Sequence, residues 1–323
     1  MAKLAGVSTS TVSRVLAHSR GVRADSKRKV EAAAAQLGYH HNAVARALRT
    51  RRSNTIGMLV PQISNPFFPA LVEAIERRLQ RENLELLLCG SQGDTEIEAR
   101  RLNTLVERQV DGIIISPCDY RASEPAVRNA LDRIRLIQVD RRVEGVVTDW
   151  VGVSDEAGFA QVVDHLVKLG RRKLVFVSSE LTNYSAHTRL DAFTAALHKH
   201  GLSSALPPML GSFEVEWGKA AAELLLPHLS DVDGIVCGND AIALGMLRGL
   251  RAASVRVPGD VAVTGFDGIS FAEISDPPLT TVHQRWETMA DECVRVLLDP
   301  ADHGPRNIAI MPILQVREST VGS

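Results

Sequence analysis

After residue 54 the sequence alternates short β-branched runs with longer stretches of helical spacing, and this alternation is the feature that most constrains the fold. The candidate strands are Thr55 to Val60, Leu84 to Cys89, Asp111 to Ser116, Leu136 to Val139, Lys173 to Ser178, Gly234 to Cys237 and Val261 to Gly265. Between the first two, residues 69–81 place Leu71, Val72, Ile75 and Leu79 on one helical face. Strands that alternate with helices form buried parallel sheets with right-handed crossovers. Because the pattern covers most of the chain, it predicts an α/β core of two doubly wound parallel-sheet lobes rather than one.

The first 50 residues have no strand signal and predict a small all-α unit. Ala2 to Ala5 fits a first helix that Gly6 ends, and Ser8 is a good N-cap for a second helix. Residues 26–37 fit a third helix that Gly38 ends. A helix, a short turn with glycine and a second helix are the parts of a helix-turn-helix, and the unit has very little apolar surface for a core.

The charge of the chain is distributed unevenly, although the net charge is only −1. Residues 1–52 hold eleven Lys and Arg against only Asp25 and Glu31, a local charge of +9, so the remaining 271 residues carry −10. Such asymmetry indicates a segment that binds a polyanion on an acidic body. Lys27 and Lys29 are the candidate phosphate contacts within it.

The second helix has the composition that a major-groove recognition helix needs. Thr9, Ser10 and Thr11 form a small, polar first turn, and Arg14 lies one turn later, where it is a candidate bidentate partner for a guanine. A short Ser/Thr-rich helix with one arginine is usually a solvated surface helix. The basic residues around it favour DNA binding instead.

Membrane, metal and redox functions find no support in the sequence. The N-terminus, MAKLAGVSTS, lacks the basic-then-apolar run of a signal peptide, and the apolar runs are far shorter than the roughly 20 residues that span a bilayer. The four cysteines form no CxxC pair and the ten histidines no ligand cluster, so we expect free thiols and no metal. No dinucleotide-type GxGxxG loop occurs. We therefore expect a cytoplasmic protein without cofactor, metal or membrane contact.

Several long motifs occur in an order that resembles the LacI/GalR family of bacterial transcription regulators. They are AKLAGVSTSTVSRVL, LGYHHNAVARAL, NTIGMLVPQISNPFF, VDGIIISP, NDAIALG, VPGDVAVTGFD, PPLTTVHQ and VREST. The resemblance implies a helix-turn-helix domain, a hinge helix and an effector-binding core similar to periplasmic sugar-binding proteins. Members of the family usually begin several residues earlier, with an Asp-Val pair, so we expect an in-frame start upstream of Met1.

The resemblance also predicts the domain boundaries. They are 1–40 for the helix-turn-helix domain, 41–54 for the hinge helix and linker, 55–154 plus 284–307 for the first lobe, and 155–283 plus 308–323 for the second lobe. The hinge residues that follow Asn42 are good helix formers but too few to form a stable helix alone, so we expect them to fold only on DNA. Family members use the residue that matches Leu48 as a wedge in the minor groove, and Asn42 is expected to contact DNA as well.

The resemblance places the effector between the two lobes, at the carboxyl ends of strands. It implies polar contacts from Arg189, Asn239, Asp267 and Gln284, apolar walls from Phe68, Phe213 and Trp286, and further contacts from Asp155, Asp140 and Arg141. Asp267 ends a predicted buried strand, where an unpaired carboxylate is costly, so a ligand or an arginine partner such as Arg189 is favoured. Phe68 fits a core position equally well. Such a cleft suits a sugar, a sugar acid or a nucleoside.

Three classes of function compete. A sequence-specific DNA-binding regulator, acting as a repressor of a carbohydrate-utilisation operon, would bind double-stranded operator DNA and an effector. It would act as a homodimer, because a two-fold protein matches a pseudo-palindromic site. A sugar-binding transport protein would share the two lobes but needs a signal peptide and no basic segment. An enzyme such as a sugar kinase or a dehydrogenase needs a phosphate-cradling glycine loop or a placed nucleophile and base, and the sequence has neither. Only the regulator explains the +9 charge.

Overall fold

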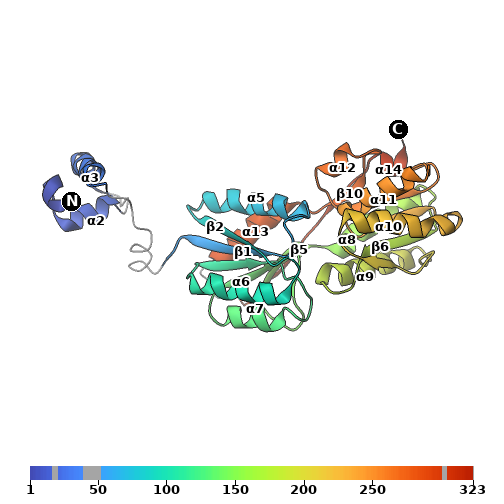
Figure 1. Cartoon of the computed structure of the whole chain (residues 1–323), viewed down its shortest axis with the longest axis horizontal. Helices are drawn as coiled ribbons and strands as arrows, with labels where there is room; N and C mark the ends of the chain where they lie inside the picture. Colours follow the sequence, from blue (N-terminus) through green and yellow to red (C-terminus); the bar gives the residue numbers. More distant parts are fainter. Residues whose placement is uncertain (17–20, 39–51, 300–303, 323) are drawn as a thin grey trace. The chain divides into compact units, whose positions relative to one another are not determined.

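The computed structural model describes residues 1–16, 21–38, 52–299 and 304–322. These residues form two compact units, Met1–Ser53, called the head below, and Asn54–Ser323, called the core (Figure 1). Most of the expected hinge segment 41–54 lies outside the described residues, and so do Asn42 and Leu48.

The described part of the head contains three short helices, as the sequence predicts. They are α1 (Ala2–Ala5), α2 (Thr9–Leu16) and α3 (Ala24–Gln36). Buried apolar side chains between these helices form a small core: Ala5, Val12, Val15, Val30 and Ala33. Gly6 ends α1 in the left-handed conformation, at φ +63°, and the Ser8 hydroxyl accepts a hydrogen bond of 3.2 Å from the Thr11 backbone N–H in the first turn of α2. The helix α3 begins at Ala24, two residues before the expected Ser26.

The first lobe of the core is a sheet of six described strands in the order β11-β5-β4-β3-β1-β2. Its strands are β1 (Thr55–Val60), β2 (Glu85–Gly90), β3 (Gly112–Ile115), β4 (Leu136–Val139), β5 (Asp149–Val153) and β11 (Asn307–Ile310). Its helices are α5 (Phe67–Gln80), α6 (Thr95–Glu107), α7 (Glu124–Leu131) and α13 (Trp286–Leu298). The helices α5 and α13 pack together on one face of the sheet, and α6 and α7 pack together on the other (Figure 1).

The second lobe repeats this plan with the strand order β12-β10-β9-β8-β6-β7. Its strands are β6 (Leu174–Ser179), β7 (Met209–Gly211), β8 (Gly234–Cys237), β9 (Ala262–Asp267), β10 (Thr280–His283) and β12 (Ile313–Gln315). Its helices are α8 (Asp155–Lys168), α9 (Tyr184–Lys199), α10 (Val215–Leu225), the 3-10 helix η1 (Leu226–Asp231), α11 (Asp240–Ala252), α12 (Phe271–Ile274) and α14 (Glu318–Val321). The helix α8 packs on α9, and α10 packs on α11.

The strands pair as buried parallel strands should. All residues of β3, β6 and β9 are buried, which requires helices on both faces of each sheet. Among the described strand pairs, only β10 with β12 is antiparallel. The α/β architecture with two doubly wound lobes is therefore as the sequence predicts.

The chain crosses between the lobes three times, which sets the lobe boundaries. It leaves the first lobe after β5, returns after β10 to form α13 and β11, and leaves again to form β12. The expected boundary of the last crossing, after residue 307, is too early by three residues. Residues 308–310 continue β11 in parallel register with β5, so the crossing lies at Met311 and Pro312. Ile308 and Ile310 before the crossing and Ile313 after it are all β-branched. The sequence pattern alone therefore does not separate the strands of the two sheets.

Candidate functional site

The helix α2 presents to solvent the side chains expected to contact DNA. Val12 and Val15 are buried against α1 and α3, whereas Thr9, Ser10 and Arg14 are exposed and Thr11 is half-buried. The helix therefore has one face for the head's core and an opposite polar face with Arg14 as a long, exposed donor. This is the arrangement that the major groove requires of a recognition helix.

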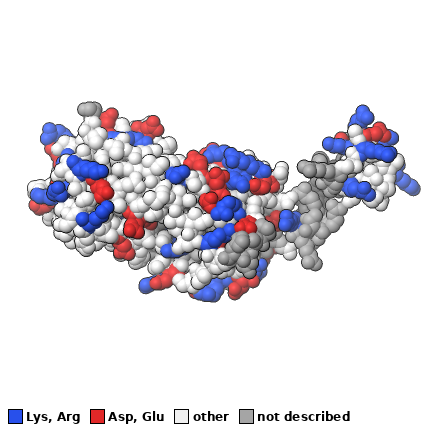
Figure 2. Space-filling view, turned by 180° about the vertical axis from the view of Figure 1, so that it is seen from behind, with Lys and Arg blue, Asp and Glu red and all other residues white. Residues whose placement is uncertain are grey.

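Lys27 and Lys29 also lie exposed, on α3. Lys27 Nζ is 3.8 Å from a carboxylate oxygen of Glu31, and Lys29 Nζ is 2.7 Å from one of Asp25. More than half of each of these side chains is exposed to water, and ion pairs of this kind contribute little stability. Both ammonium groups can therefore leave their partners for a phosphate at little cost. Figure 2 shows Lys and Arg spread over the described part of the head with few acidic residues among them.

The core contains a small cavity, of about 10 Å³, between its two lobes, called the cleft below. The residues that line it follow the carboxyl ends of strands or begin helices: Asn65, Phe67, Phe68, Asp140, Arg141, Ser185, Arg189, Phe213, Asn239 and Asp267. The first five belong to the first lobe and the other five to the second lobe. The carboxyl ends of parallel strands are where open α/β sheets bind their ligands.

Two helix caps position the side chains from the second lobe. Asn183 caps α9 through a 3.1 Å hydrogen bond from the Ala186 backbone N–H, and this helix carries Ser185 and Arg189 into the cleft. Asn239 caps α11 with its Oδ1, which accepts 2.9 Å from the Ile242 backbone N–H. Because Oδ1 is used in the cap, the amide nitrogen of Asn239 is the atom available to a ligand.

Arg189 is the most strongly held of the charged groups in the cleft. Its Nε lies 3.1 Å from Asp155 Oδ1, and its Nη1 lies 2.7 Å from the Gly238 carbonyl oxygen and 3.4 Å from Asp267 Oδ1. The guanidinium carbon sits 4.2 Å from the centroid of the Phe266 ring. Only about 4% of the Arg189 side chain is exposed, so the two carboxylates depend on it for their neutralisation.

Of the two carboxylates that line the cleft, Asp267 has the more strongly raised pKa. Burial raises the pKa of Asp267 to about 7, although Arg189 and the hydrogen bond of 2.6 Å from Gln284 Nε2 act in the opposite direction. Burial likewise raises the pKa of Asp140 to about 6. Both residues have positive φ, +119° for Asp267 and +59° for Asp140, a conformation that is uncommon outside glycine. Backbone strain of this kind concentrates at ligand-binding sites.

These raised pKa values predict how pH acts on stability. The folded protein keeps a proton on Asp267 up to about pH 7, whereas the unfolded chain releases it near its ordinary pKa of 3.8, so the folded state binds more protons between these values. The contribution of Asp267 to the free energy of unfolding therefore falls as pH rises from about 4 to 7. Asp267→Asn removes this titration. We expect its unfolding free energy to decline less than that of the wild type between pH 5 and 7, by on the order of 2 kcal/mol.

Urea unfolding at pH 5, 6 and 7 measures this difference. Asp260→Asn is the matched control, because its ion pair with Arg256 lowers the pKa of the exposed Asp260 to about 2, outside the tested range. The same pH dependence in Asp267→Asn and in the wild type would contradict the assignment.

Arg141 lies between two aromatic rings at the other side of the cleft. Its guanidinium carbon is 5.7 Å from the centroid of Phe68 and 5.6 Å from that of Phe213, and its Nε is 3.8 Å from Asp140 Oδ2. Its Nε has no hydrogen-bond partner among the described residues, and the same holds for two other buried atoms, Asn239 Nδ2 and Gln284 Oε1. Buried polar atoms are almost always paired, so the two that belong to lining residues, Arg141 Nε and Asn239 Nδ2, point to a ligand that offers acceptors.

The structure brings together most of the residues expected at the effector site. Seven of them line the cleft: Phe68, Asp140, Arg141, Arg189, Phe213, Asn239 and Asp267. Asp155 and Gln284 lie behind this lining, where Asp155 binds Arg189 and Gln284 binds Asp267. Trp286 is not among the lining residues and stacks on His283, with ring centroids 4.3 Å apart. Their roles toward an effector remain predictions.

Three lining residues were missed in the sequence, Asn65, Phe67 and Ser185. Asn65 lies in the short segment that follows β1, Phe67 begins α5, and Ser185 lies in the first turn of α9. A rule that takes every residue after the carboxyl end of a predicted parallel strand would have found the first two.

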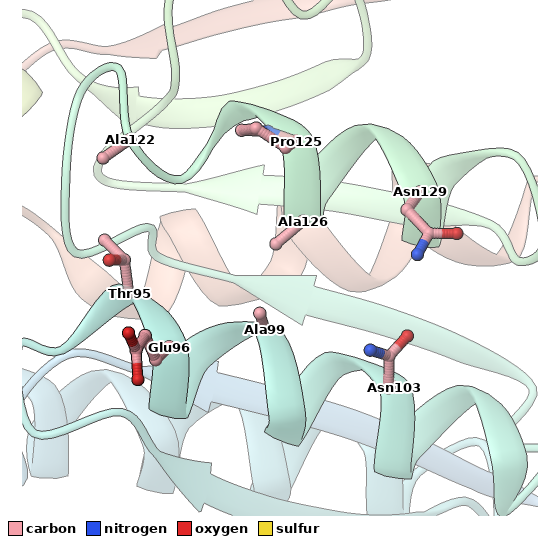
Figure 3. Close-up of a pocket in the computed structure, with 8 residues that line it drawn as sticks. All are labelled: Thr95, Glu96, Ala99, Asn103, Ala122, Pro125, Ala126 and Asn129. Atoms are coloured by element: carbon pink, nitrogen blue, oxygen red, sulfur yellow. The ribbon is translucent and has the colours of Figure 1, made fainter.

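A second cavity, of about 340 Å³, lies on the surface of the first lobe between α6 and α7 (Figure 3). Its lining consists of small and neutral side chains, with Glu96 as the one charged residue: Thr95, Glu96, Ala99, Asn103, Ala122, Pro125, Ala126 and Asn129. It is larger than the cleft but offers no buried, convergent polar groups, so the cleft is the better candidate for a specific ligand.

Two findings concern metal sites and membrane spans in the described part of the chain. No group of three or more His, Cys, Asp or Glu residues there has the arrangement of a metal site. None of the described helices is both long and apolar enough to cross a membrane.

Comparison with known proteins agrees with both parts of this architecture. Residues 1–42 match the family model for bacterial regulatory proteins of the lacI family, and residues 163–320 match a periplasmic binding protein-like domain. The chain is 31% identical over 325 residues to the ribose operon repressor of Escherichia coli (strain K12), with 99% of this chain and 98% of that protein covered. It is also 31% identical over 334 residues to the transcriptional repressor PurR of Haemophilus influenzae (strain PittEE), with 99% and 97% covered.

Solved structures show the same similarity. The lac repressor dimer bound to operator and the anti-inducer ONPF superimposes with a TM-score of 0.88 at 26% identity, covering 99% of this chain and 98% of that one. A LacI family transcriptional regulator from Enterococcus faecium with bound ribose gives a TM-score of 0.72 at 29% identity, covering 82% and 98%. The curated relatives are repressors that match this chain over almost its whole length. The chain belongs to the LacI family of bacterial regulatory proteins.

Proposed function

We propose that this protein is a DNA-binding transcriptional repressor whose cleft binds a small neutral sugar that controls DNA binding. The observation that carries the proposal is the set of buried donors and acceptors between aromatic rings in the cleft, in one chain with a basic helix-turn-helix head. The role needs no catalytic residue, and the protein would regulate genes of carbohydrate utilisation.

Ring sugars fit the chemistry of the cleft. Phe68 and Phe213 offer aromatic faces to the apolar C–H side of a sugar ring, Asp140 and Asp267 accept hydrogen bonds from hydroxyls, and Arg141 donates them. The free space in the cleft is only about 10 Å³, so the residues that line it must move to admit any ligand, and a monosaccharide needs the smallest movement of the sugars. Two of the relatives carry ribose in their names, so ribose is the first compound to test.

The other effector classes fit less well. A sugar acid would place its charge near three carboxylates, those of Asp140, Asp155 and Asp267, with only Arg141 and Arg189 to oppose them. A nucleoside needs more space than a monosaccharide. The transport-protein alternative does not account for the basic head.

For DNA, we assign recognition to the helix-turn-helix domain at residues 1–40 and the connection to the core to residues 41–54. Thr9, Ser10, Thr11 and Arg14 would face base edges, and Lys27 and Lys29 would bind phosphates, with Asn42 and Leu48 acting in the minor groove. The lac repressor relative binds operator as a dimer, and a homodimer on a two-fold operator is the corresponding proposal here.

Isothermal titration of the full chain tests the effector. We expect ribose to bind with a 1:1 stoichiometry per chain, and ribose 5-phosphate, ribonate and adenosine to bind at least tenfold more weakly. Tighter binding of either anion would assign the cleft to sugar acids or phosphates, and tighter binding of adenosine would assign it to nucleosides. Sucrose serves as the control for size, since a disaccharide should not fit.

Arg14→Ala should reduce selectivity, whereas Lys27→Ala should not. A bidentate contact of an arginine with guanine contributes about 1–3 kcal/mol of discrimination at one base pair, and a phosphate contact contributes to all sequences alike. Binding is measured on a duplex selected from a random library by the full chain, and on its single-base variants. A uniform loss over all variants for Arg14→Ala would make Arg14 a backbone contact, and a loss confined to one position for Lys27→Ala would make Lys27 a base contact.

A further inference from the structure

A group of aromatic and charged side chains joins the two lobes beside the cleft and is not part of its lining. Tyr120, Arg142 and Trp150 come from the first lobe, and Tyr184 and His187 come from the start of α9 in the second lobe. Trp150 lies on β5, the strand from which the chain crosses to the second lobe (Figure 1). None of these five residues lines the cleft.

Arg142 is the centre of this group. Its guanidinium carbon lies 4.9 Å from the centroid of the Trp150 ring and 4.7 Å from that of the Tyr184 ring. The two rings are 6.0 Å apart and inclined at 69°. A guanidinium within about 6 Å of an aromatic face is attracted by it, and here one cation contacts a ring from each lobe.

Tyr120 adds a second link between the lobes. Its ring lies 6.0 Å from that of Tyr184 and 5.3 Å from that of His187. Its backbone N–H donates a 2.8 Å hydrogen bond to the carbonyl oxygen of Thr182 in the second lobe. Its own carbonyl accepts 2.8 Å from the Glu144 N–H in the first lobe, which fixes the loop that carries it.

The residues of this group are next to the cleft in sequence or by hydrogen bond. Asp140, Arg141 and Ser185 line the cleft. Arg142 directly follows the first two in the sequence, and Tyr184 directly precedes the third. The indole N–H of Trp150 donates 3.3 Å to the carbonyl oxygen of Asp140. A ligand that holds Asp140, Arg141 and Ser185 in place therefore also holds the groups that face each other across the lobes.

We propose that Arg142, Trp150 and Tyr184 form an interlobe latch that keeps the lobes closed around the effector and slows its release. The inference rests on the proposed function, because it takes the cleft as the effector site. These residues position the two lobes and do not touch the ligand. The latch supplies attraction that depends on the distance between the lobes, so it favours the closed arrangement over one in which the rings have separated.

The test compares ribose affinity and dissociation rate in the full chain. Arg142→Ala and Tyr184→Ala should each weaken ribose binding about two- to fivefold, mainly through faster dissociation, as expected for the loss of cation–π contacts between partly exposed side chains. The double variant should be hardly weaker than Tyr184→Ala, because Arg142 contacts the second lobe through the Tyr184 ring. Tyr184→Phe, which keeps the ring, should restore most of the affinity. Arg121→Ala is the matched control, since Arg121 pairs with Glu144 within the first lobe and should leave ribose binding unchanged.

Hydrogen exchange of the ligand-free chain separates the latch from the choice of effector. The backbone N–H of Tyr120 donates a hydrogen bond to Thr182 in the other lobe. This amide should therefore exchange faster in Arg142→Ala and in Tyr184→Ala, and at the wild-type rate in Arg121→Ala. If the wild type does not bind ribose but the two variants show faster exchange, the effector is wrong and the latch stands. Unchanged exchange in both variants, or additive losses of affinity in the double variant, would overturn the latch.

Discussion

Arg189→Ala is expected to abolish ribose binding and to lower the free energy of unfolding of the core by about 3–5 kcal/mol. Arg189 is almost completely buried and neutralises Asp155 and Asp267 at once. Alanine leaves these carboxylates buried without a cation and also removes a side chain from the wall of the cleft. Titration with ribose measures the first effect, and urea unfolding measures the second.

The matched control is Arg256→Ala. Arg256 also forms an ion pair with a carboxylate, Asp260, but its side chain is largely exposed, so its loss should change neither ribose binding nor stability measurably. DNA binding by Arg189→Ala without effector should persist at a temperature where the variant is folded, because Arg189 belongs to the core. A variant that binds ribose as tightly as the wild type would exclude Arg189 from the effector site.

Removal of the head is expected to abolish specific DNA binding and to leave ribose binding intact. A shortened chain that begins at Asn54 retains the whole described core, which forms its own compact unit. It should bind ribose within twofold of the full chain, since the described residues that line the cleft all belong to the core. Its affinity for the selected duplex should fall at least a thousandfold, the lower end of the difference of about 10³–10⁷ between specific and non-specific binding.

Fluorescence anisotropy with labelled duplex and titration with ribose measure these two quantities on the same preparation. Retained binding of the selected duplex by the shortened chain would place DNA recognition in the core. Loss of ribose binding in a chain that still unfolds cooperatively would mean that the head takes part in the effector site.

The strands and helices that could be predicted from the sequence are those with strong local patterns. Residues 55–60 and 173–178 are apolar runs bounded by turn residues, and they form β1 and most of β6. The strands β5, β7, β10, β11 and β12 were not predicted, and β5 and β12 show why. The first begins with Asp149 and Trp150, and the second is three residues long, so neither has the alternation or the length of a typical strand. Their partners, β11 and β10, are far away in the sequence, and tertiary pairing rather than local propensity forms these strands.

The candidate site could be predicted to a similar extent. Burial of a carboxylate at the end of β9 predicted either a ligand or an arginine partner for Asp267, and Arg189 lies 3.4 Å from it. The contact of Arg142 with Tyr184 could not be predicted, because it joins residues of two lobes that no local pattern connects. For the same reason the sequence did not show that Trp286 would pack on His283.

Titration of a DNA complex with ribose tests the central claim most directly. The full chain is bound to the duplex that it selects from a random library, and the Kd is measured at constant salt with and without saturating ribose. We expect the selected sequences to have two-fold symmetry, and we expect ribose to raise the Kd at least tenfold, within the range of about 5–150-fold that is typical of allosteric coupling. Arg189→Ala should show no change with ribose. A Kd that ribose leaves unchanged, in a protein shown to bind ribose in the cleft, would contradict control of DNA binding through this site.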